Sequence, residues 1–462
     1  MSGSPATLAE TAMTAPADER APSLPRLLAG ITEQGAMTLP EHLATHGPLP
    51  ARLQRPRNRW RPREQAGALI EEINRAGLLG RGGAAFPTAK KMRAVAGARG
   101  RAIVVANGAE GEPASLKDHT LMEMLPHLVI DGAVLAAEAV GADEVILATC
   151  EFAGHSADGV ALALQERAAA GLDDASKVHV VSVPGHYVAG QESALVNYLS
   201  GGPAKPLFTP PMPFEQGVRR RPTLVNNIET LAHVALIARH GPGWFRQLGL
   251  PSQPGSALIT LSGPVAHPGV YEIEHGASLA SVIEAGGGTT TRVRGALMGG
   301  YGGTWIGGEL LRGVALSNEH LAPHGASLGA GVVLLLSEQA CPVAESARLA
   351  RWLADQSTRQ CGPCVHGLDA LATTLAEIAG GIGGARASQR IDELAYLVTR
   401  RGACAHPDGV AGLVLSSLET FHAEFADHAR NGPCEACGRP NELPLPRRPV
   451  SEETIRRRAA RP

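Results

Sequence analysis

One glycine-rich segment has the residue types and the spacing that most clearly suggest chemistry. Residues 76–91 read AGLLGRGGAAFPTAKK, and glycines that tolerate φ > 0 allow several backbone amides to converge on one anion. A helix is predicted directly afterwards, over residues 88–96, so its N-terminus would add the positive end of a helix dipole. Arg81 and Lys91 add formal charge. The segment therefore predicts a loop that holds a phosphate group.

The same loop also fits the dinucleotide fingerprint G-x-G-x-x-G/A, through Gly80, Gly82 and Ala85. That fingerprint requires a strand before the loop, within a βαβ unit. Residues 68–75 precede it instead, with apolar residues at helical spacing, and a strand-like run at 102–106 comes only afterwards. The context therefore argues against a Rossmann loop, and a glycine-rich surface turn is the remaining alternative.

Three further polar loops are each expected at the junction between a strand and a helix. A carboxylate or an amide at such a place can hydrogen-bond a ring edge or sugar hydroxyls. Each loop alone is a weak signal, because such residues more often cap helices or form turns. Together they are what a ligand crevice in an α/β fold needs. The loops and their candidate residues are 107–113 with Asn107, Glu110 and Glu112, 185–193 with Tyr187, Gln191 and Glu192, and 225–230 with Asn226, Asn227 and Thr230.

The alternation of elements predicts how the chain is divided. Strand-like runs at 102–106, 144–149 and 177–183 alternate with helical stretches such as 128–140, which implies an α/β domain. Short β-rich runs joined by Gly and Pro turns then indicate a compact β-grasp module, and helical periodicity follows it. The predicted boundaries are 1–64 for a disordered leader and a loosely packed Pro/Arg-rich arm, 65–250 for the α/β domain, 251–336 for the β-grasp domain, 337–430 for the helical domain and 431–462 for a tail.

The composition limits the classes of protein to consider. A chain of 462 residues has room for two to four domains. The formal net charge is −2 and no long basic stripe occurs, so nothing indicates a nucleic-acid partner. Residues 1–26 lack the charged start and apolar centre of a signal peptide, and no apolar run approaches the ~18 residues of a transmembrane helix. We therefore expect a soluble, cytoplasmic protein that meets a membrane only through partners.

Seven cysteines in a chain that is not expected to be secreted favour metal or redox use over disulfides. Cys361 and Cys364 form one C-x-x-C pair, and Cys404 stands alone after them. The second pair, Cys434 and Cys437, is half of a zinc-knuckle or rubredoxin-like motif, and structural zinc needs four ligands. Two reduced thiols on a flexible tail are the alternative.

These motifs, in this order and at these spacings, resemble the NADH-binding flavoprotein subunit of respiratory complex I. The same core occurs in the diaphorase subunits of NAD-linked hydrogenases and formate dehydrogenases. The resemblance covers about residues 65–425 and includes the G-R-G-G-x-x-F-P loop, Lys117-Asp118, the 187–193 loop, N-N-x-E-T from Asn226, and MGGYGGTW at 298–305. The co-occurrence of these elements in one order is highly specific.

The resemblance implies an FMN-binding α/β domain, a β-grasp domain of the soluble-ligand-binding kind and a C-terminal helical iron–sulfur domain. In such a protein hydride passes from NADH to the flavin, so the ring carries the chemistry and no catalytic side chain is expected. Electrons would leave singly through a [4Fe-4S] cluster to a ferredoxin-like or membrane redox partner. The resemblance places FMN phosphate and ribityl contacts at Gly80, Gly82, Lys91, Asn226, Asn227 and Thr230, the flavin ring near Asn107, Glu110 and Gln191, NADH near Phe86, Glu112, Tyr187 and Glu192, and the cluster on Cys361, Cys364 and Cys404.

The chain departs from the family pattern at the cluster. Thr358 stands where the first of the family's clustered cysteines is expected, so one iron would lack its usual thiolate. An unusual fourth ligand, a three-iron cluster and no cluster are all open. Cys341, His366 and the pair Cys434/Cys437 are candidate substitutes.

The NADH half departs from the family pattern as well. Ala109 and Gln191 stand where the family carries carboxylates, and Met212 stands where it carries an aromatic ring. The loss of a stacked ring should weaken nucleotide binding by about 1 kcal/mol. The residues therefore support FMN more strongly than NADH. Two alternatives stay open: an FMN and iron–sulfur subunit that uses another donor, and a degenerate subunit that only scaffolds a redox complex.

Overall fold

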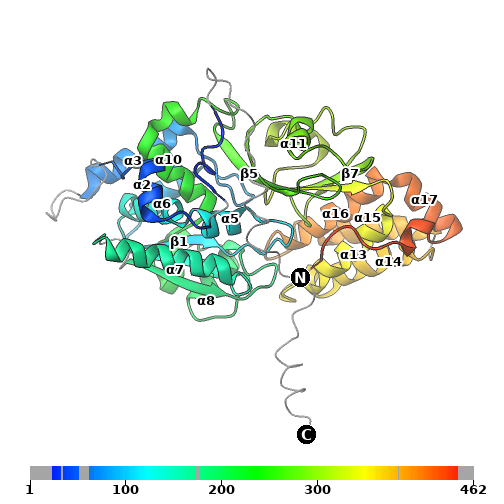
Figure 1. The fold of residues 1–462 in the computed structure, drawn as a ribbon. Helices are drawn as coiled ribbons and strands as arrows, with labels where there is room; N and C mark the ends of the chain where they lie inside the picture. The colour runs from blue at the N-terminus through cyan, green and yellow to red at the C-terminus, as the bar shows by residue number, and fades with distance from the viewer. Residues whose placement is uncertain (1–22, 33–34, 51–61, 173–176, 383, 446–462) are drawn as a thin grey trace, which may run out of the picture.

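The computed structural model describes residues 23–32, 35–50, 62–172, 177–382 and 384–445, and Figure 1 shows three units side by side. A parallel sheet with its helices lies on the left, a mixed sheet lies at the upper right and a bundle of helices lies at the lower right. This arrangement confirms the predicted fold class. Most of the predicted leader (1–26) and the last part of the predicted tail (446–462) lie outside the described residues.

The first sheet has four parallel strands in the order β3-β2-β1-β4. Side chains alternate along β1, so that Val104 and Ala106 enter the core shared with α6 and α10, whereas Ile103 and Val105 enter a smaller core beneath α8. A strand that is buried on both faces is typical of parallel sheets. The strands are β1 (Ala102–Gly108), β2 (Ala142–Cys150), β3 (Val178–Val183) and β4 (Thr223–Asn227).

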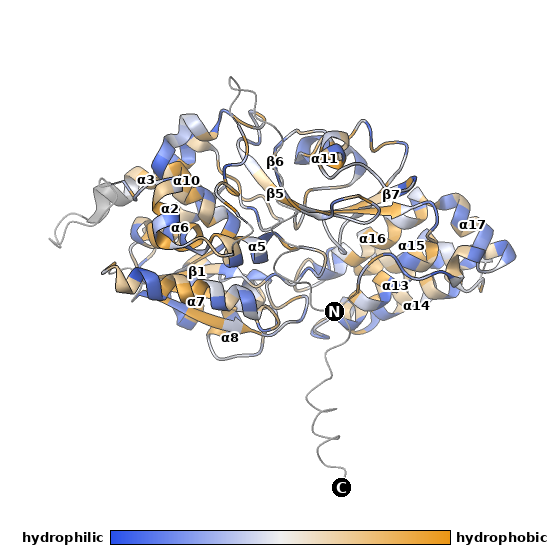
Figure 2. Ribbon diagram, in the orientation of Figure 1, coloured by the Kyte–Doolittle hydropathy of each residue, from blue (hydrophilic) through white to orange (hydrophobic). Residues whose placement is uncertain are grey.

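Two apolar helices, α6 and α10, pack against each other at the centre of this domain. Almost every residue of α6 is buried, and both helices are largely orange in Figure 2. Among the described residues no single helix is long and apolar enough to cross a membrane, and α5 and α6 reach that length together only across a 98° bend. The helices here are α2 (Leu39–His46), α3 (Pro62–Ala76), α4 (Thr88–Gly97), α5 (Lys117–Met124), α6 (Pro126–Val140), α7 (Gly154–Ala169), α8 (Glu192–Leu199), α9 (Pro213–Gln216) and α10 (Ile228–Phe245).

The second sheet has five strands in the order β6-β5-β9-β7-β8. β5 pairs with β9 in parallel, and the other neighbouring strands are antiparallel. Leu279 and Val282 of α11 share one apolar core with residues from these strands. The elements are β5 (Ser256–Ser262), β6 (Gly269–Glu274), α11 (Leu279–Ala285), β7 (Val293–Met298), β8 (Thr304–Gly307), α12 (Asn318–Leu321) and β9 (Val332–Ser337).

The helical region differs from the predicted pattern at one point. Helical periodicity over residues 410–429 predicts a single helix, but the structure divides it at Phe421. Phe421 is 2% exposed, and its ring contacts that of Trp305 with the centroids 5.2 Å apart. Burial of this ring against the second sheet therefore accompanies a break that helical periodicity does not predict. The helices are α13 (Pro342–Asp355), α14 (Leu368–Ala379), α15 (Gly384–Val398), α16 (His406–Thr420) and α17 (His422–Asn431).

The predicted arm packs more closely than we expected. Leu27 is fully buried in the core of the first domain. His42 of α2 lies 2.8 Å from the carboxylate of Asp131 in α6, and both side chains are buried. The prediction of a loosely packed arm is therefore wrong for the described part of residues 27–63. A few anchoring residues without a periodic pattern hold it, and composition does not reveal them.

The described part of the predicted tail also folds back onto the molecule. The Glu442 carboxylate accepts a hydrogen bond from the Ser337 amide at 3.0 Å, and the Glu442 amide donates to Glu345 at 2.7 Å. Leu443 is 2% exposed. Residues 432–445 therefore form an ordered strap over the second sheet and the helical region, which we call the C-terminal strap.

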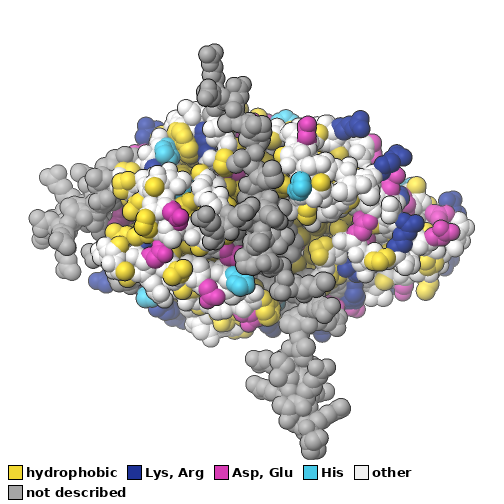
Figure 3. All heavy atoms as spheres, in the orientation of Figure 1, with side chains coloured by type: hydrophobic (Ala, Val, Ile, Leu, Met, Phe, Trp, Pro, Cys, Tyr) yellow, Lys and Arg dark blue, Asp and Glu magenta, His cyan; other side chains and the backbone are white. Residues whose placement is uncertain are grey.

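The surface carries charges of both signs. On the face shown in Figure 3, basic and acidic side chains are interspersed over the described residues, without a broad patch of one sign. Nucleic-acid backbones are bound by continuous basic surfaces. This face offers no such surface among those residues.

Candidate functional site

The predicted residues gather at the carboxyl ends of β1 and β4, where the order of the strands reverses. From β1 the chain continues to β2 and β3 on one side, whereas β4 lies on the other side. Asn107 of β1 is level with Asn227 of β4, and Ala106 is level with Asn226. Ligands of open α/β sheets bind in the crevice outside such a switch point. The topology therefore places the 107–113 and 225–230 loops around one crevice.

The glycine-rich loop reaches this crevice just before α4 begins. The Gly80 amide donates to the Phe86 carbonyl at 2.9 Å, which closes the loop at its base. A Cβ atom at Gly82 would lie 3.3 Å from Cβ of Asn227, so the absence of a side chain lets the loop approach the end of β4. Gly83 has φ +98°, a value that other residues rarely adopt. The structure thus brings the predicted phosphate loop onto the N-N-x-E-T element.

Arg81 and Thr230 hold the loop in place. The Arg81 amide donates to the Thr230 hydroxyl oxygen at 2.9 Å. The Arg81 guanidinium donates to the carbonyls of Ser256 at 3.0 Å and Pro254 at 3.4 Å, and lies 3.9 Å from Glu229. Burial lowers the pKa of Arg81 to about 10, although Glu229 opposes the shift. These side chains brace the loop against the second sheet, and their direct contact with a cofactor stays a prediction.

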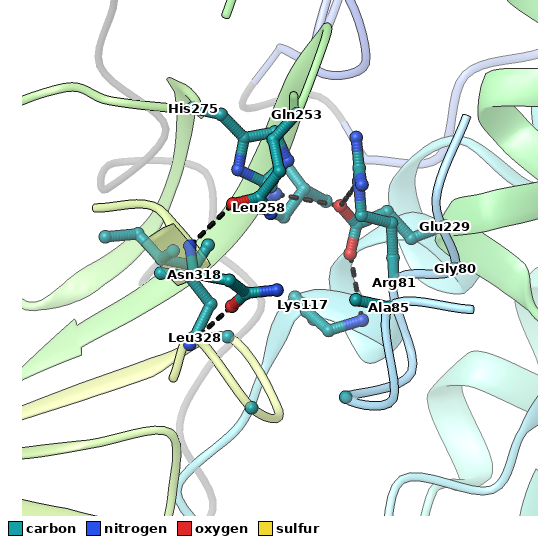
Figure 4. Close-up of a pocket in the computed structure, with 15 residues that line it drawn as sticks. Gly80, Arg81, Ala85, Lys117, Glu229, Gln253, Leu258, His275, Asn318 and Leu328 are labelled. Atoms are coloured by element: carbon teal, nitrogen blue, oxygen red, sulfur yellow. Dashed lines mark hydrogen bonds and ion pairs between the residues drawn. The ribbon is translucent and has the colours of Figure 1, made fainter. Parts of the chain in front are cut away.

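Lys117 is a buried cation beside the crevice. The sequence motif Lys117-Asp118 included it, but the predicted site residues did not. Its Nζ lies 2.7 Å from Asp118 and 2.9 Å from Glu229, and the residue is 2% exposed. Figure 4 shows it beside the glycine-rich loop, in a small pocket that also includes Gly80. Burial opposes its charge, but Asp118, Glu229 and Glu110 outweigh this and raise the pKa of Lys117. A lysine directly before an aspartate, following an acidic loop, was the available signal.

Asn226 provides a test of whether the crevice fits FMN. Its side chain is 6% exposed, and its Nδ2 has no hydrogen-bond partner in the part of the chain that the structure describes. A buried donor without a partner is costly, so an oxygen of a bound ligand would satisfy it. Asn227 instead caps α10, since its Oδ1 accepts from the Glu229 amide at 3.0 Å. The loop amides, the start of α4 and the free Asn226 amide fit the phosphate and ribityl oxygens of FMN.

The two carboxylates of the acidic loop lie in different environments. Glu110 accepts hydrogen bonds from the Ser115 hydroxyl and from the His119 amide at the start of α5. Burial, with the charge of Asp118 added to it, raises the pKa of Glu110. Glu112 accepts from the Tyr301 amide at 2.9 Å and from the Tyr187 hydroxyl at 3.2 Å, so it joins three separate loops.

The stability of the protein should depend on pH through Glu112. Burial raises the pKa of Glu112 from 4.5 to about 7. The folded state therefore keeps a proton that the unfolded state has released, and stability falls as pH rises from about 4.5 to about 7. Glu112→Gln should remove this loss, so the variant should gain roughly 3 kcal/mol relative to the wild type between pH 5 and pH 8. Urea unfolding at the two pH values measures the difference, and an equal gap at both would contradict the assignment.

The third loop connects the crevice to the helical region. The ring of Tyr187 packs edge-on against Trp352 of α13, with the centroids 5.6 Å apart, and lies tilted against His406 of α16 at 5.3 Å. His406 is two residues after Cys404. Gln191 acts as the cap of α8, since its Oε1 accepts from the amides of Ser193 and Ala194. A contact of Gln191 with the flavin ring stays a prediction.

Four further predicted residues line the outer part of the site. Lys91 lies 2.6 Å from Glu192 and donates to the Val225 carbonyl at 2.7 Å, so both predicted side chains meet beside β4. Phe86 is 47% exposed, which leaves much of its ring free for stacking. Asn107 donates to the Gly190 carbonyl at 2.9 Å and thereby joins the first and third loops.

The predicted cluster cysteines come together in the helical region. Burial, followed by the nearby thiols of Cys361 and Cys404, raises the pKa of Cys364 to about 12. The three thiols therefore lie near one another, and their binding of an iron–sulfur cluster, with Thr358 in place of the family's remaining cysteine, stays a prediction. Of the candidate substitutes, His366 is exposed. The others, Cys341, Cys434 and Cys437, face one another and His428.

Comparison with known proteins identifies the family. Residues 73–236 match the model of the Nuo51 FMN-binding domain, 258–303 match the SLBB domain and 344–428 match the NADH-ubiquinone oxidoreductase-F iron-sulfur binding region. The second F subunit of the NADH-quinone oxidoreductase of Rhizobium meliloti is 33% identical over 388 residues, which is 79% of this chain and 90% of that protein. The chain belongs to this family of NADH-quinone oxidoreductase F subunits. The corresponding F subunit of Streptomyces coelicolor is 31% identical over 79% of this chain and 84% of its own length.

Solved structures agree with this assignment. The crystal structure of an NAD+-reducing [NiFe]-hydrogenase in the H2-reduced state matches with a TM-score of 0.73 and 30% identity. The match covers 82% of this chain but 64% of the hydrogenase chain, just under two thirds of its length. The family prediction is therefore confirmed. This family member combines an FMN-binding domain, an SLBB domain and an iron–sulfur region.

Proposed function

We propose that this protein is the NADH-oxidising flavoprotein subunit of a multi-subunit redox system. The observation that carries the proposal is the crevice at the switch point, where the glycine-rich loop, the unpartnered amide of Asn226 and the Tyr187 loop meet. When bound, FMN takes the hydride of NADH and gives up its electrons singly. Family membership supports the same activity, since the curated relatives are named NADH-quinone oxidoreductases.

The chain's own residues would bind and orient the reactants. Backbone amides at Gly80 and Gly82, and Nδ2 of Asn226, would hold phosphate and ribityl oxygens. Phe86 offers a partly exposed ring to the nicotinamide nucleotide. Tyr187 and Glu112, hydrogen-bonded to each other, would close the crevice and exclude water. No acid or base is required of the protein in this arrangement.

Electrons would leave toward the helical region. Tyr187 contacts His406, which follows Cys404 closely in the chain, so the crevice and the cysteines are joined by packed side chains. Cys361, Cys364 and Cys404 would hold the cluster. A ferredoxin-like or membrane-bound redox subunit would then accept the electrons, and we propose a cytoplasmic location for this chain.

A second candidate function keeps FMN and the cluster but uses a donor other than NADH. Ala109 and Gln191 replace two carboxylates of the family pattern, and Met212 replaces a ring. In addition, Glu112 already accepts hydrogen bonds from Tyr187 and the Tyr301 amide. These differences lie in the NADH half of the site, whereas the residues expected to contact the phosphate and ribityl group of FMN keep the family pattern.

An absorption spectrum of anaerobically purified protein, before and after addition of NADH, distinguishes the two. Bleaching of the flavin band by NADH is expected under the first function. A flavin band that responds to dithionite but not to NADH would favour the second. A colourless protein would contradict both.

The ring of Phe86 gives a sharper test of NADH binding. Phe86→Ala should raise the KM for NADH about fivefold, because one stacked ring contributes about 1 kcal/mol, while FMN content stays unchanged. Tyr396→Ala, which removes an exposed ring on α15, is the matched control. An unchanged KM in Phe86→Ala would show that the nucleotide does not stack there.

A further inference from the structure

Four side chains converge in the helical region outside the flavin crevice. The ligand atoms of Cys341, His428, Cys434 and Cys437 all lie within 4.8 Å of one another. Cys434 and Cys437, the C-x-x-C pair of the tail, are thus joined by His428 of α17 and by Cys341 at the start of α13. We propose that these four residues form a tetrahedral site of the structural zinc class, separate from the iron–sulfur cluster, that fastens the C-terminal strap to the helical region.

The spacing of the ligand atoms suits one tetrahedral ion. With Zn–S near 2.3 Å and Zn–N near 2.0 Å, the edges of the tetrahedron are about 3.8 Å between sulfurs and about 3.5 Å between sulfur and nitrogen. The sulfurs of Cys434 and Cys437 are 3.7 Å apart. Nε2 of His428 lies 3.4 Å from the sulfur of Cys341 and 3.8 Å from that of Cys437. A single ion therefore fits among them with little movement of the chain.

Neighbouring groups orient two of the ligands. Nδ1 of His428 lies 3.0 Å from the Ala379 carbonyl, which can only accept, so Nδ1 carries the proton and the Nε2 lone pair faces the sulfurs. Metal-binding histidines usually have such an outer partner. Cys341 caps α13, and its sulfur accepts from the Ala344 amide at 3.4 Å, which fixes the sulfur at the start of the helix. Cys341 and His428 are 3% and 1% exposed, so the site is buried on that side.

The chemistry of the set favours zinc over the alternatives. Three thiolates and one imidazole in tetrahedral geometry are a recognised structural zinc set. A four-iron cluster needs its ligands spread around a larger core than one ion occupies. The set also does not include Cys361, Cys364 or Cys404.

The proposed site would hold the C-terminal strap in place beside the crevice. Beyond Cys437, Glu442 bonds to Ser337 and the Pro444 carbonyl accepts from the Tyr301 hydroxyl. The Tyr301 amide donates to Glu112, so the strap contacts a residue that supports the acidic loop. Loss of the ion should therefore release the C-terminal strap before it disturbs the rest of the fold.

Metal content measured on the full-length protein tests the proposal. Anaerobically purified wild type from zinc-supplemented cells should contain about one zinc per chain. The double variant Cys434→Ser/Cys437→Ser should contain at least about tenfold less zinc per chain than the wild type and the same amount of iron. Proteases should also cut it at new sites after Asn431. Cys361→Ser should lose iron and keep zinc. Wild type with its iron but no zinc would overturn the proposal, and so would loss of iron in the double variant equal to that in Cys361→Ser.

Variants of His428 keep the test decisive if the double variant does not fold. His428→Cys preserves four zinc ligands and should retain zinc, because a four-cysteine set also binds it. His428→Ala should lose zinc at least about tenfold. Equal zinc contents in the two variants would contradict a ligand role for His428.

Discussion

Lys117→Met is expected to lower the free energy of unfolding by about 3–5 kcal/mol, because it leaves buried carboxylates without their cation. Asp118 and Glu229 both lie within 3 Å of Nζ and are buried. The charge of Glu110 acts on the same lysine. Because Lys117 lies beside the glycine-rich loop, the variant should also bind FMN poorly. Urea unfolding followed by circular dichroism, together with the flavin content of the purified protein, measures both effects.

Two companion variants show whether charge is the cause. Lys117→Met/Glu229→Gln removes one of the two carboxylates that lose their lysine partner and should recover part of the lost stability. Lys91→Met breaks an ion pair with Glu192 in the same crevice, but those side chains are 22% and 33% exposed, so the loss should stay below about 1 kcal/mol. If Lys117→Met were as mild as Lys91→Met, the charge of Lys117 would not be what stabilises this buried cluster.

The backbone path around the site could be predicted from the sequence because it depends on local pattern. The strand-like run at 102–106 became β1, and the helix predicted over 88–96 became α4 (Thr88–Gly97). The glycines of the loop marked a place where the backbone must approach another element, and Gly82 does approach Asn227. Each of these signals lies within a few residues of the feature that it predicts.

Partnerships between distant residues could not be predicted in this way. Arg81 was expected to supply charge to the crevice, yet its guanidinium contacts carbonyls of Pro254 and Ser256, more than 170 residues away. His428 completes a cysteine set that begins at Cys341, and nothing in the local sequence of either residue indicates the other. Spacing in the chain carries no information about such contacts until the fold is known.

Gly132 lies where α6 crosses α10, and the largest steric effect is expected there. A Cβ atom at this position would overlap the backbone carbonyl of Leu231, which has no side-chain freedom with which to move away. Gly132→Ala should therefore destabilise the first domain by about 3 kcal/mol or more, despite the roughly 1 kcal/mol by which alanine favours a helix. Hydrogen–deuterium exchange in α6 and α10, with the thermal midpoint, measures the loss.

Gly67→Ala in α3 separates the steric effect of Gly132→Ala from helix propensity. Gly67 is exposed, and a Cβ atom there would have no neighbour within 4 Å. This control should be neutral or more stable by up to about 1 kcal/mol, because only the propensity gain remains. Opposite signs for the same substitution in two helices of one domain would show that contact between backbones requires glycine at 132. Similar values for both variants would mean that α6 and α10 can separate without cost, which the burial of nearly all of α6 argues against.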